Sequence, residues 1–171
     1  HSNFKCILID DVSTDDSVKV ASLAIDGDKR FKIIKNKNKN FALKNIYNCL
    51  SEEEIDDQDV IVLLDGDDWL SSHKTLNCLN DFYEIENCWS TYGSYILFPH
   101  GIRGPEPSEY PSSIIKNNTY RSDKWRASHL RTFKYHLWKK ILEKDLKNEQ
   151  GHFYDVAYDQ AIMLPILEMA G

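Results

Sequence analysis

The sequence lacks the features that mark membrane-spanning, disulfide-framed and zinc-binding proteins. None of its apolar runs is long enough to cross a bilayer, and we expect neither a transmembrane segment nor a signal peptide. The four cysteines form no Cys-x-x-Cys pair, and no two of the six histidines have the spacing of a metal pair on a helix. We therefore expect buried thiols in a reducing compartment and a cytoplasmic protein, with peripheral membrane attachment left open.

The chain has no excess of positive charge, which excludes one further class. The net charge of −6 argues against a general nucleic-acid binder. With 171 residues, 42% hydrophobic and 28% charged, the chain fits a soluble globular protein, and it has no internal repeat. The lysines and arginines gather in residues 29–44 and 116–147, either as solvated faces or as flanks of an anionic substrate.

The most informative segment combines a buried strand with a cluster of carboxylates. The apolar run Val60–Leu64 predicts the strand, and Asp65, Asp67 and Asp68 follow it directly. Crowded carboxylates repel one another, and hard cations such as Mg²⁺ or Mn²⁺ prefer oxygen ligands. Gly66 lets the backbone turn sharply between them. The pattern predicts a metal–diphosphate site at the carboxyl end of this strand.

A second apolar run, Phe4–Ile9, also ends in acidic residues. Residues 13–16 are Ser, Thr, Asp and Asp, and the beginning of a helix explains them well. The beginning of a helix does not explain Asp10 and Asp11, because they precede it. We therefore predict a ligand-binding role for at least one of these two carboxylates.

Strands and helices alternate in the first half of the chain. Strands are expected over 4–9, 31–34 and 60–64, and helices near 15–25, 41–50 and 72–86. The helix faces expected to point inward carry Val18, Ala21 and Ile25 in the first helix, and Ala42, Ile46, Cys49 and Leu50 in the second. This order predicts a three-layer α/β/α sandwich with a mainly parallel sheet, in which the three strands are parallel neighbours.

The second half of the chain has a different pattern. We expect a strand over 91–98, a long loop over 99–113, a helix over 133–142, and a last helix that begins near Val156 and breaks at Pro165. Long loops at the edge of an α/β sheet often cover a substrate. Ligands in such sheets bind beyond the carboxyl ends of the strands, where both aspartate clusters are expected.

Several segments, in order, resemble the nucleotide-diphospho-sugar glycosyltransferases of the GT-A fold, and in particular glycosyltransferase family 2. The segments are "ILIDDVSTDDS", "NKNFALKNIYNCL", "VIVLLDGDDWL", "HLRTFKYHLWKKI" and "YDQAIMLPILEMAG". The resemblance implies one transferase-like domain over 1–171, with a nucleotide-binding half (1–90) and an acceptor-side half (91–171). Because the chain begins at what would be the family's second strand, we expect it to lack the first one.

The resemblance also implies an activity and a set of roles. The reaction would be metal-dependent, inverting transfer of a sugar from a nucleotide-diphospho-sugar, a UDP-sugar above all, to a hydroxyl of a glycan, lipid or protein, as in polysaccharide biosynthesis. Asp11 would bind the uracil or ribose, and Lys44 would lie near the nucleotide. Asp65 and Asp67 would contact the ribose and hold Mn²⁺ or Mg²⁺. Asp159 would be the general base. The oligomeric state is left open.

Two positions depart from the family pattern. A glycine of the family is Asn40 here, and asparagine tolerates a left-handed backbone better than most residues. The family's paired acids near the base are Tyr158-Asp159 here, which leaves one carboxylate.

Structural interpretations stand beside the functional ones. Asp159 could cap the last helix, and His129 and Arg131 could be surface residues of a basic helix rather than ligands of phosphate or acceptor. His152 could be a third metal ligand or a solvated loop residue, and Trp69 is expected in the core.

Two other functions remain as alternatives. A phosphoacceptor receiver domain also has acidic residues after two strands, although Asp11 and Asp65 are widely separated for that class. The second alternative is a non-catalytic, transferase-like module that binds glycans.

Overall fold

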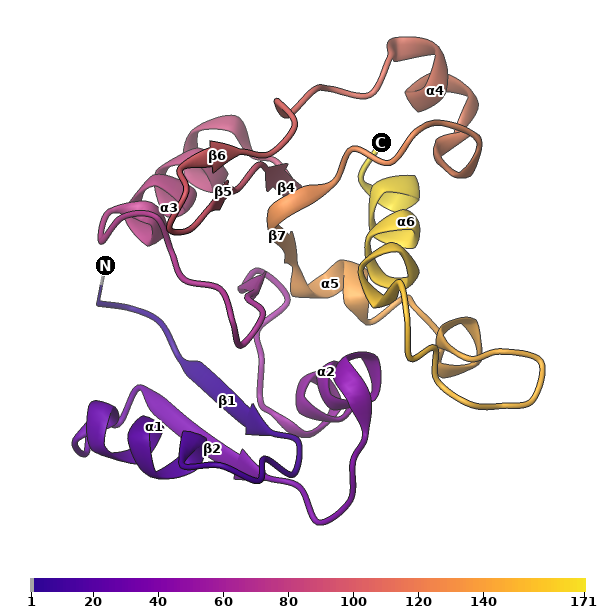
Figure 1. Cartoon of the computed structure of the whole chain (residues 1–171). Helices are drawn as coiled ribbons and strands as arrows, with labels where there is room; N and C mark the ends of the chain where they lie inside the picture. Colours follow the sequence, from indigo (N-terminus) through magenta and orange to yellow (C-terminus); the bar gives the residue numbers. More distant parts are fainter. Residues whose placement is uncertain (1) are drawn as a thin grey trace. The chain divides into compact units, whose positions relative to one another are not determined.

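The computed structural model describes residues 2–171, and its chain divides into two compact units, His1–Glu53 and Glu54–Gly171 (Figure 1). The boundary falls between a helix and the strand that leads to the central acidic cluster. The two halves expected from the resemblance, 1–90 and 91–171, stay a prediction.

The first unit contains a parallel pair of strands and two helices. Its elements are β1 (Cys6–Asp10), α1 (Ser17–Ile25), β2 (Phe31–Lys35) and α2 (Phe41–Glu52). β1 and β2 are parallel and pair from Cys6↔Phe31 to Asp10↔Lys35. The prediction that the first two strands are parallel neighbours is therefore confirmed, and α1 is the crossover between them.

The two helices of this unit differ in how well their inward faces were predicted. In α1 the least exposed side chains are Val18, Ala21 and Ile25, as expected. In α2 the buried residues are Leu43, Asn45 and Leu50, whereas Ala42 is exposed. The inward face of α2 is thus rotated by about one residue, which places its larger aliphatic side chains inside.

The second unit is built on a three-stranded antiparallel sheet. The sheet order is β3 (Val60–Leu63), β7 (Ser128–Lys134) and β4 (Ser90–Gly93). A separate hairpin joins β5 (Ile96–Leu97) to β6 (Ile102–Arg103). The helical elements are α3 (Thr75–Glu86), α4 (Ser112–Asn117), α5 (Tyr135–Trp138), α6 (Tyr158–Ala170) and the 3₁₀ turns Tyr120–Ser122 and Glu143–Leu146.

The mainly parallel three-layer sandwich is not what the structure shows. Among the described residues, β3 hydrogen bonds only to β7, antiparallel, with Leu63 opposite Arg131. The helix expected over 133–142 is present only in part. Phe133 lies in β7, and the α-helical residues are Tyr135–Trp138. A strand partner so far along the chain leaves no signal in the local pattern of either segment.

The last helix continues through Pro165, where we expected a break. A proline inside a helix costs about 3 kcal/mol, because a hydrogen bond is lost and the ring crowds the preceding turn. Four side chains around it are buried, and each contributes about 1.5–3 kcal/mol. These are Ile162, Met163, Ile166 and Leu167. Their burial outweighs the cost of the proline.

A chain of buried hydroxyl groups lies inside the second unit. Thr132, on the central strand β7, is fully buried, and its Oγ1 lies 2.8 Å from the Tyr83 hydroxyl and 2.6 Å from Thr91 Oγ1. Burial raises the pKa of Tyr83 to about 12, so its hydroxyl stays neutral. Thr132 therefore joins α3, β7 and β4 through polar contacts that are shielded from water.

We expect Thr132→Val to destabilise the second unit by about 1–3 kcal/mol. The valine keeps the shape of the side chain but leaves two buried hydroxyls without their shared partner. Urea denaturation followed by circular dichroism measures the loss. Thr14→Val, at an exposed position, is the matched control and should change stability by less than about 0.5 kcal/mol. Equal stability of the two variants would show that the hydroxyl chain contributes nothing.

Candidate functional site

The pairing of β3 with β7 gathers a group of possible metal ligands. Because Leu63 lies opposite Arg131 in antiparallel register, Asp65 and His129 follow at the same level beyond the end of β3. Asp65, Asp68 and His129 each offer one ligand atom, and these atoms lie within 4.8 Å of one another. A turn closed by the Asp68 amide, which donates to the Asp65 carbonyl at 3.1 Å, brings the two carboxylates together.

The chemistry of this group suits a divalent cation. Two carboxylate oxygens and one imidazole nitrogen are ligands that Mn²⁺ accepts, whereas Mg²⁺ prefers oxygen alone. Three protein ligands leave further coordination positions for phosphate oxygens or water. Asp65 and His129 are half-buried and Asp68 is exposed, so the group is open to a substrate.

Asp67 lies outside this group. It is exposed, and the group formed by the described residues contains Asp68 in its place. The metal role predicted for Asp67 therefore stays a prediction, whereas Asp65 occupies the position expected of a ligand. His152 is exposed in a loop and does not belong to the group either.

A buried arginine connects this group to the beginning of α6. Arg131 is 5% exposed, and its Nη2 lies 3.2 Å from His129 Nε2 and 3.7 Å from an Asp159 carboxylate oxygen. Its Nη1 donates to the Tyr158 hydroxyl at 3.5 Å, a long hydrogen bond. The interpretation of Arg131 as a surface residue of a basic helix is therefore wrong.

Tyr158 completes the connection between the carboxylates. Its hydroxyl donates a hydrogen bond to Asp65. Burial, together with this bond to a carboxylate, raises the pKa of Tyr158 well above its usual value. Tyr158 therefore stays a neutral donor that orients Asp65. The resemblance led us to expect a second acidic residue at this position. The chain has Tyr158 there, and its hydroxyl binds Asp65, one of the three possible metal ligands (Asp65, Asp68 and His129, called the metal group below).

Asp159 has both of the features that the two interpretations require. It is half-buried in the first turn of α6 and lies beside Arg131, as a base within the site would. It is also the acidic residue in the first turn of α6, where a carboxylate interacts favourably with the helix dipole, and one of its oxygens accepts a hydrogen bond from the Gln160 amide at 2.9 Å. The base assignment stays a prediction.

In the first unit, Asp11 organises the loop before α2. Its carboxylate accepts hydrogen bonds from the Asn36 side chain at 2.7 Å, the Asn40 amide at 2.8 Å and the Phe41 amide at 2.9 Å. Burial alone would raise the pKa of Asp11, but these hydrogen bonds and the nearby Asn45 amide lower it to about 2. The acidic residue that a helix start did not explain thus has a clear structural role.

The left-handed position in this loop is not the one we expected. Asn40 has a φ of −113°, whereas Phe41 has a φ of 61°. A left-handed backbone costs a residue with a bulky side chain about 1–2 kcal/mol. Because the Asp11 carboxylate holds both amides, it fixes where the turn falls and offsets this cost. Lys44 is half-buried in α2, and its expected contact with a nucleotide stays a prediction.

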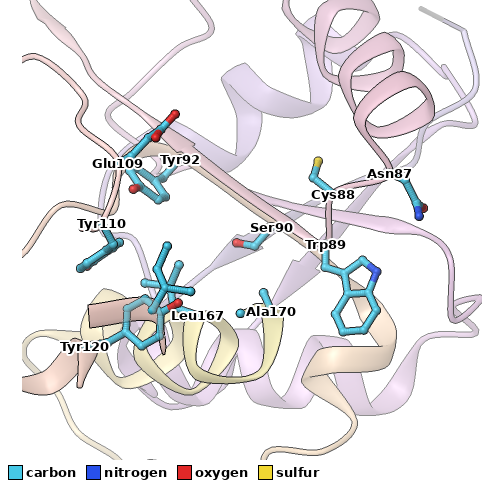
Figure 2. Close-up of a pocket in the computed structure, with 12 residues that line it drawn as sticks. Asn87, Cys88, Trp89, Ser90, Tyr92, Glu109, Tyr110, Tyr120, Leu167 and Ala170 are labelled. Atoms are coloured by element: carbon cyan, nitrogen blue, oxygen red, sulfur yellow. The ribbon is translucent and has the colours of Figure 1, made fainter. Parts of the chain in front are cut away.

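A separate cavity of about 360 Å³ lies at the other end of α6. Figure 2 shows aromatic side chains around it, among them Trp89, Tyr92, Tyr110 and Tyr120, together with Leu167 and Ala170 of the last helical turns. Its lining does not include the metal group or Asp159. The cavity is therefore not part of the site described above.

Fold and site together define a class: an α/β protein with a carboxylate–imidazole group at the end of a strand. Residues 1–152 match the family model described as Glycosyl transferase family 2, and the chain therefore belongs to that family. The resemblance seen in the sequence is thus confirmed. Membership of the family implies a GT-A type of α/β fold and supports glycosyltransferase activity with a nucleotide-sugar donor and an acceptor. A comparison with curated proteins gave no match.

The range matched by the family model, residues 1–152, includes most but not all of the predicted site residues. It contains Asp11, Lys44, Asp65 and Asp67 and ends before Asp159, so the base assignment depends on the geometry of α6 rather than on the family match. Because the chain belongs to this family, we no longer consider the alternative that it is a phosphoacceptor receiver domain. Among the described residues, no helix combines the length and apolar character needed to traverse a bilayer.

We expect Asp11→Asn to remove a pH-dependent part of the first unit's stability. The folded-state pKa of about 2 lies below the ordinary 3.8, so this stability is present above about pH 4 and is lost as pH falls toward 2. The expected difference is on the order of 1–2 kcal/mol at neutral pH. Hydrogen exchange of the α2 amides at a series of pH values measures it.

Asp15→Asn is the matched control, because Asp15 also binds a nearby amide but is exposed. An Asp11→Asn variant with unchanged pH dependence between pH 4 and 2 would contradict the role given to the Asp11 carboxylate.

Proposed function

We propose that this protein catalyses metal-dependent, inverting transfer of a sugar from a UDP-sugar to an acceptor hydroxyl. The single observation that supports it is the grouping of Asp65, Asp68 and His129 at the end of β3. These residues would hold Mn²⁺ or Mg²⁺, which when bound supplies positive charge for the diphosphate that leaves. Tyr158 orients Asp65 through its hydrogen bond.

In the proposed reaction, Asp159 takes the proton from the acceptor hydroxyl. The acceptor oxygen forms a bond to the anomeric carbon from the face opposite the diphosphate. The bond between that carbon and the diphosphate oxygen breaks, and its electron pair leaves with the diphosphate. One displacement inverts the anomeric centre. Arg131 supports this assignment because its guanidinium lies 3.7 Å from the Asp159 carboxylate and helps to hold it in place.

The donor contacts of the first unit are proposed on the resemblance alone. Asp11 would bind the uracil or ribose, and Lys44 would lie near the nucleotide. The Asp11 carboxylate already accepts hydrogen bonds from Asn36, Asn40 and Phe41. A contact with the donor would therefore have to share or replace one of these bonds. No observation favours the non-catalytic, glycan-binding alternative.

The metal assignment predicts which aspartates matter. In calorimetric titrations, Mn²⁺ should bind weakly to the protein alone and more tightly when UDP is present, because diphosphate oxygens complete the coordination. Asp68→Asn and His129→Gln should each weaken this binding by at least about tenfold, since the loss of a residue that only supports a metal ligand already costs about 10–100-fold in metal affinity.

Asp67→Asn is the matched control, since it removes an adjacent exposed carboxylate. If Asp67→Asn abolished Mn²⁺ binding and Asp68→Asn left it intact, the geometric assignment would be wrong and the original Asp67 prediction right.

The base assignment predicts a separation between stability and rate. Asparagine keeps the size of the side chain and one acceptor oxygen and loses mainly the interaction of the charge with the helix dipole, so Asp159→Asn should change stability by less than about 1 kcal/mol. Transfer should fall on the order of 10²-fold or more, as expected when general-base help is lost. Binding of UDP with Mn²⁺ should be nearly unchanged. Transfer at the parental rate would show that Asp159 only begins the helix.

A further inference from the structure

The β5–β6 hairpin gathers several exposed large apolar side chains within a few residues. We define the apolar hairpin as residues 95–104. Its exposed fractions are 56% for Ile96, 50% for Leu97, 74% for Phe98 and 57% for Ile102. The hairpin forms its own two-stranded sheet, apart from the β3–β7–β4 sheet (Figure 1). Exposed apolar groups gathered in this way mark a contact with a partner or a membrane.

The exposed residues lie on both faces of the hairpin. Leu97 pairs with Ile102, and Ile96 pairs with Arg103, so the two pairs point to opposite sides. A protein partner docked on a flat ribbon would cover one of these faces and leave the other in water. A surrounding apolar medium covers both at once. This arrangement therefore favours the interfacial region of a lipid bilayer.

The charge of the hairpin agrees with a lipid surface. Residues 93–105 contain no Asp or Glu, although the whole chain carries a net charge of −6. The charged side chain within the apolar hairpin is Arg103, and His100 lies in its turn. A segment without negative charge is suited to approach the phosphate groups of anionic lipids.

A tryptophan stands beside the tip of the hairpin. Trp69 is 63% exposed, which corrects our expectation of a core residue. Its ring packs edge-on against the ring of Phe98, and the two ring centroids are 5.0 Å apart. Tryptophan is enriched at membrane–water boundaries, where its ring is half in lipid and its N–H is in water. Trp69 follows Asp68 directly in the chain, so this surface adjoins the metal group.

The base of the hairpin is packed against the same group. The Tyr95 ring lies edge-on to His129 at 5.5 Å. It also lies so close to Gly104 that a Cβ there would approach the ring to 2.7 Å. Gly104 therefore allows Tyr95 to fold over the base of the hairpin and contact the imidazole.

We propose that the apolar hairpin, together with Trp69, inserts into the interfacial layer of an anionic membrane and holds the metal group at its surface. This function is separate from sugar transfer and does not need donor or metal. The hairpin is too short to span the bilayer, so the attachment is peripheral.

Vesicle co-sedimentation of the full chain tests the proposal. The probes are vesicles of phosphatidylcholine alone and of phosphatidylcholine mixed with phosphatidylglycerol, without metal or nucleotide. The wild-type chain should sediment with the mixed vesicles more than with the neutral ones. The double variant Leu97→Gln/Phe98→Gln should bind the mixed vesicles at least about tenfold more weakly, because two apolar side chains no longer leave water.

The control is Val20→Gln/Leu23→Gln, which removes two equally exposed apolar side chains from α1 and should bind like the wild type. Arg103→Gln should reduce only the preference for phosphatidylglycerol. Circular dichroism confirms that each variant is folded, as expected for exposed positions.

Two results would overturn the proposal. One is that the wild type binds neither vesicle, and the other is that the hairpin variant binds as well as the control. Concentration-dependent self-association that is lost in the hairpin variant, without vesicle binding, would assign the hairpin to a protein interface instead. Because these measurements use no donor, their failure is distinguishable from failure of the proposed transferase activity.

Discussion

The antiparallel pairing of β3 with β7 is the constraint on which the candidate site depends. It brings together segments that are far apart in the sequence, and its register sets Asp65 level with His129. It also places Arg131 inside the unit, where its guanidinium meets residues that begin α6. A slip of one residue would turn Arg131 to the other face of the sheet and separate these groups. The neighbours Thr132 and Phe133 are fully buried on opposite faces of the sheet, and they oppose such a slip too, because it would exchange the polar surroundings of Thr132 with the apolar surroundings of Phe133.

Local patterns predicted much of the first unit and only part of the second. β1, β2 and their parallel pairing follow from two short apolar runs joined by an amphipathic helix, and both are adjacent in sequence. β3 was also placed correctly, since Val60–Leu63 is a clear apolar run. Its partner was not, because the segment 128–134 mixes basic, hydroxyl and aromatic side chains and has no obvious period. The aromatic residues that follow suggested a helix over 133–142, of which only Tyr135–Trp138 are α-helical, and the expected start falls inside β7.

Among the site residues, too, those that belong to a short local pattern could be predicted, and those that depend on contacts between distant segments could not. Asp65 could be predicted because carboxylates at the end of a buried strand are visible within a few residues. The grouping of Asp68 with Asp65 and His129 could not, since it depends on the turn that joins Asp65 to Asp68. His129 and Arg131 could have been found from their spacing of two, which puts both on one face of a strand. That signal has meaning only once the segment is known to be a strand.

The loop before α2 shows a similar limit. The sequence indicated that Asp11 needed an explanation beyond helix capping, and the structure supplies one in three hydrogen bonds. It did not indicate that Phe41 would take the left-handed backbone, since asparagine is intrinsically the better residue for it. The hydrogen bonds from the Asn40 and Phe41 amides to the Asp11 carboxylate outweigh the unfavourable backbone conformation of Phe41. Hydrogen bonds to a charged group contribute about 1.5–3 kcal/mol each.

The contacts of the two ring nitrogens of His129 determine where the imidazole carries its hydrogen. A neutral imidazole has one nitrogen that carries hydrogen and one with a free lone pair. Arg131 can only donate, so its contact with His129 Nε2 uses that lone pair and leaves the hydrogen on Nδ1, 3.4 Å from Asp68. If Nδ1 held a metal ion, the hydrogen would lie on Nε2 and the contact with Arg131 would be lost. The imidazole would then couple the occupation of one of its nitrogens to the hydrogen bonding of a buried guanidinium at the other.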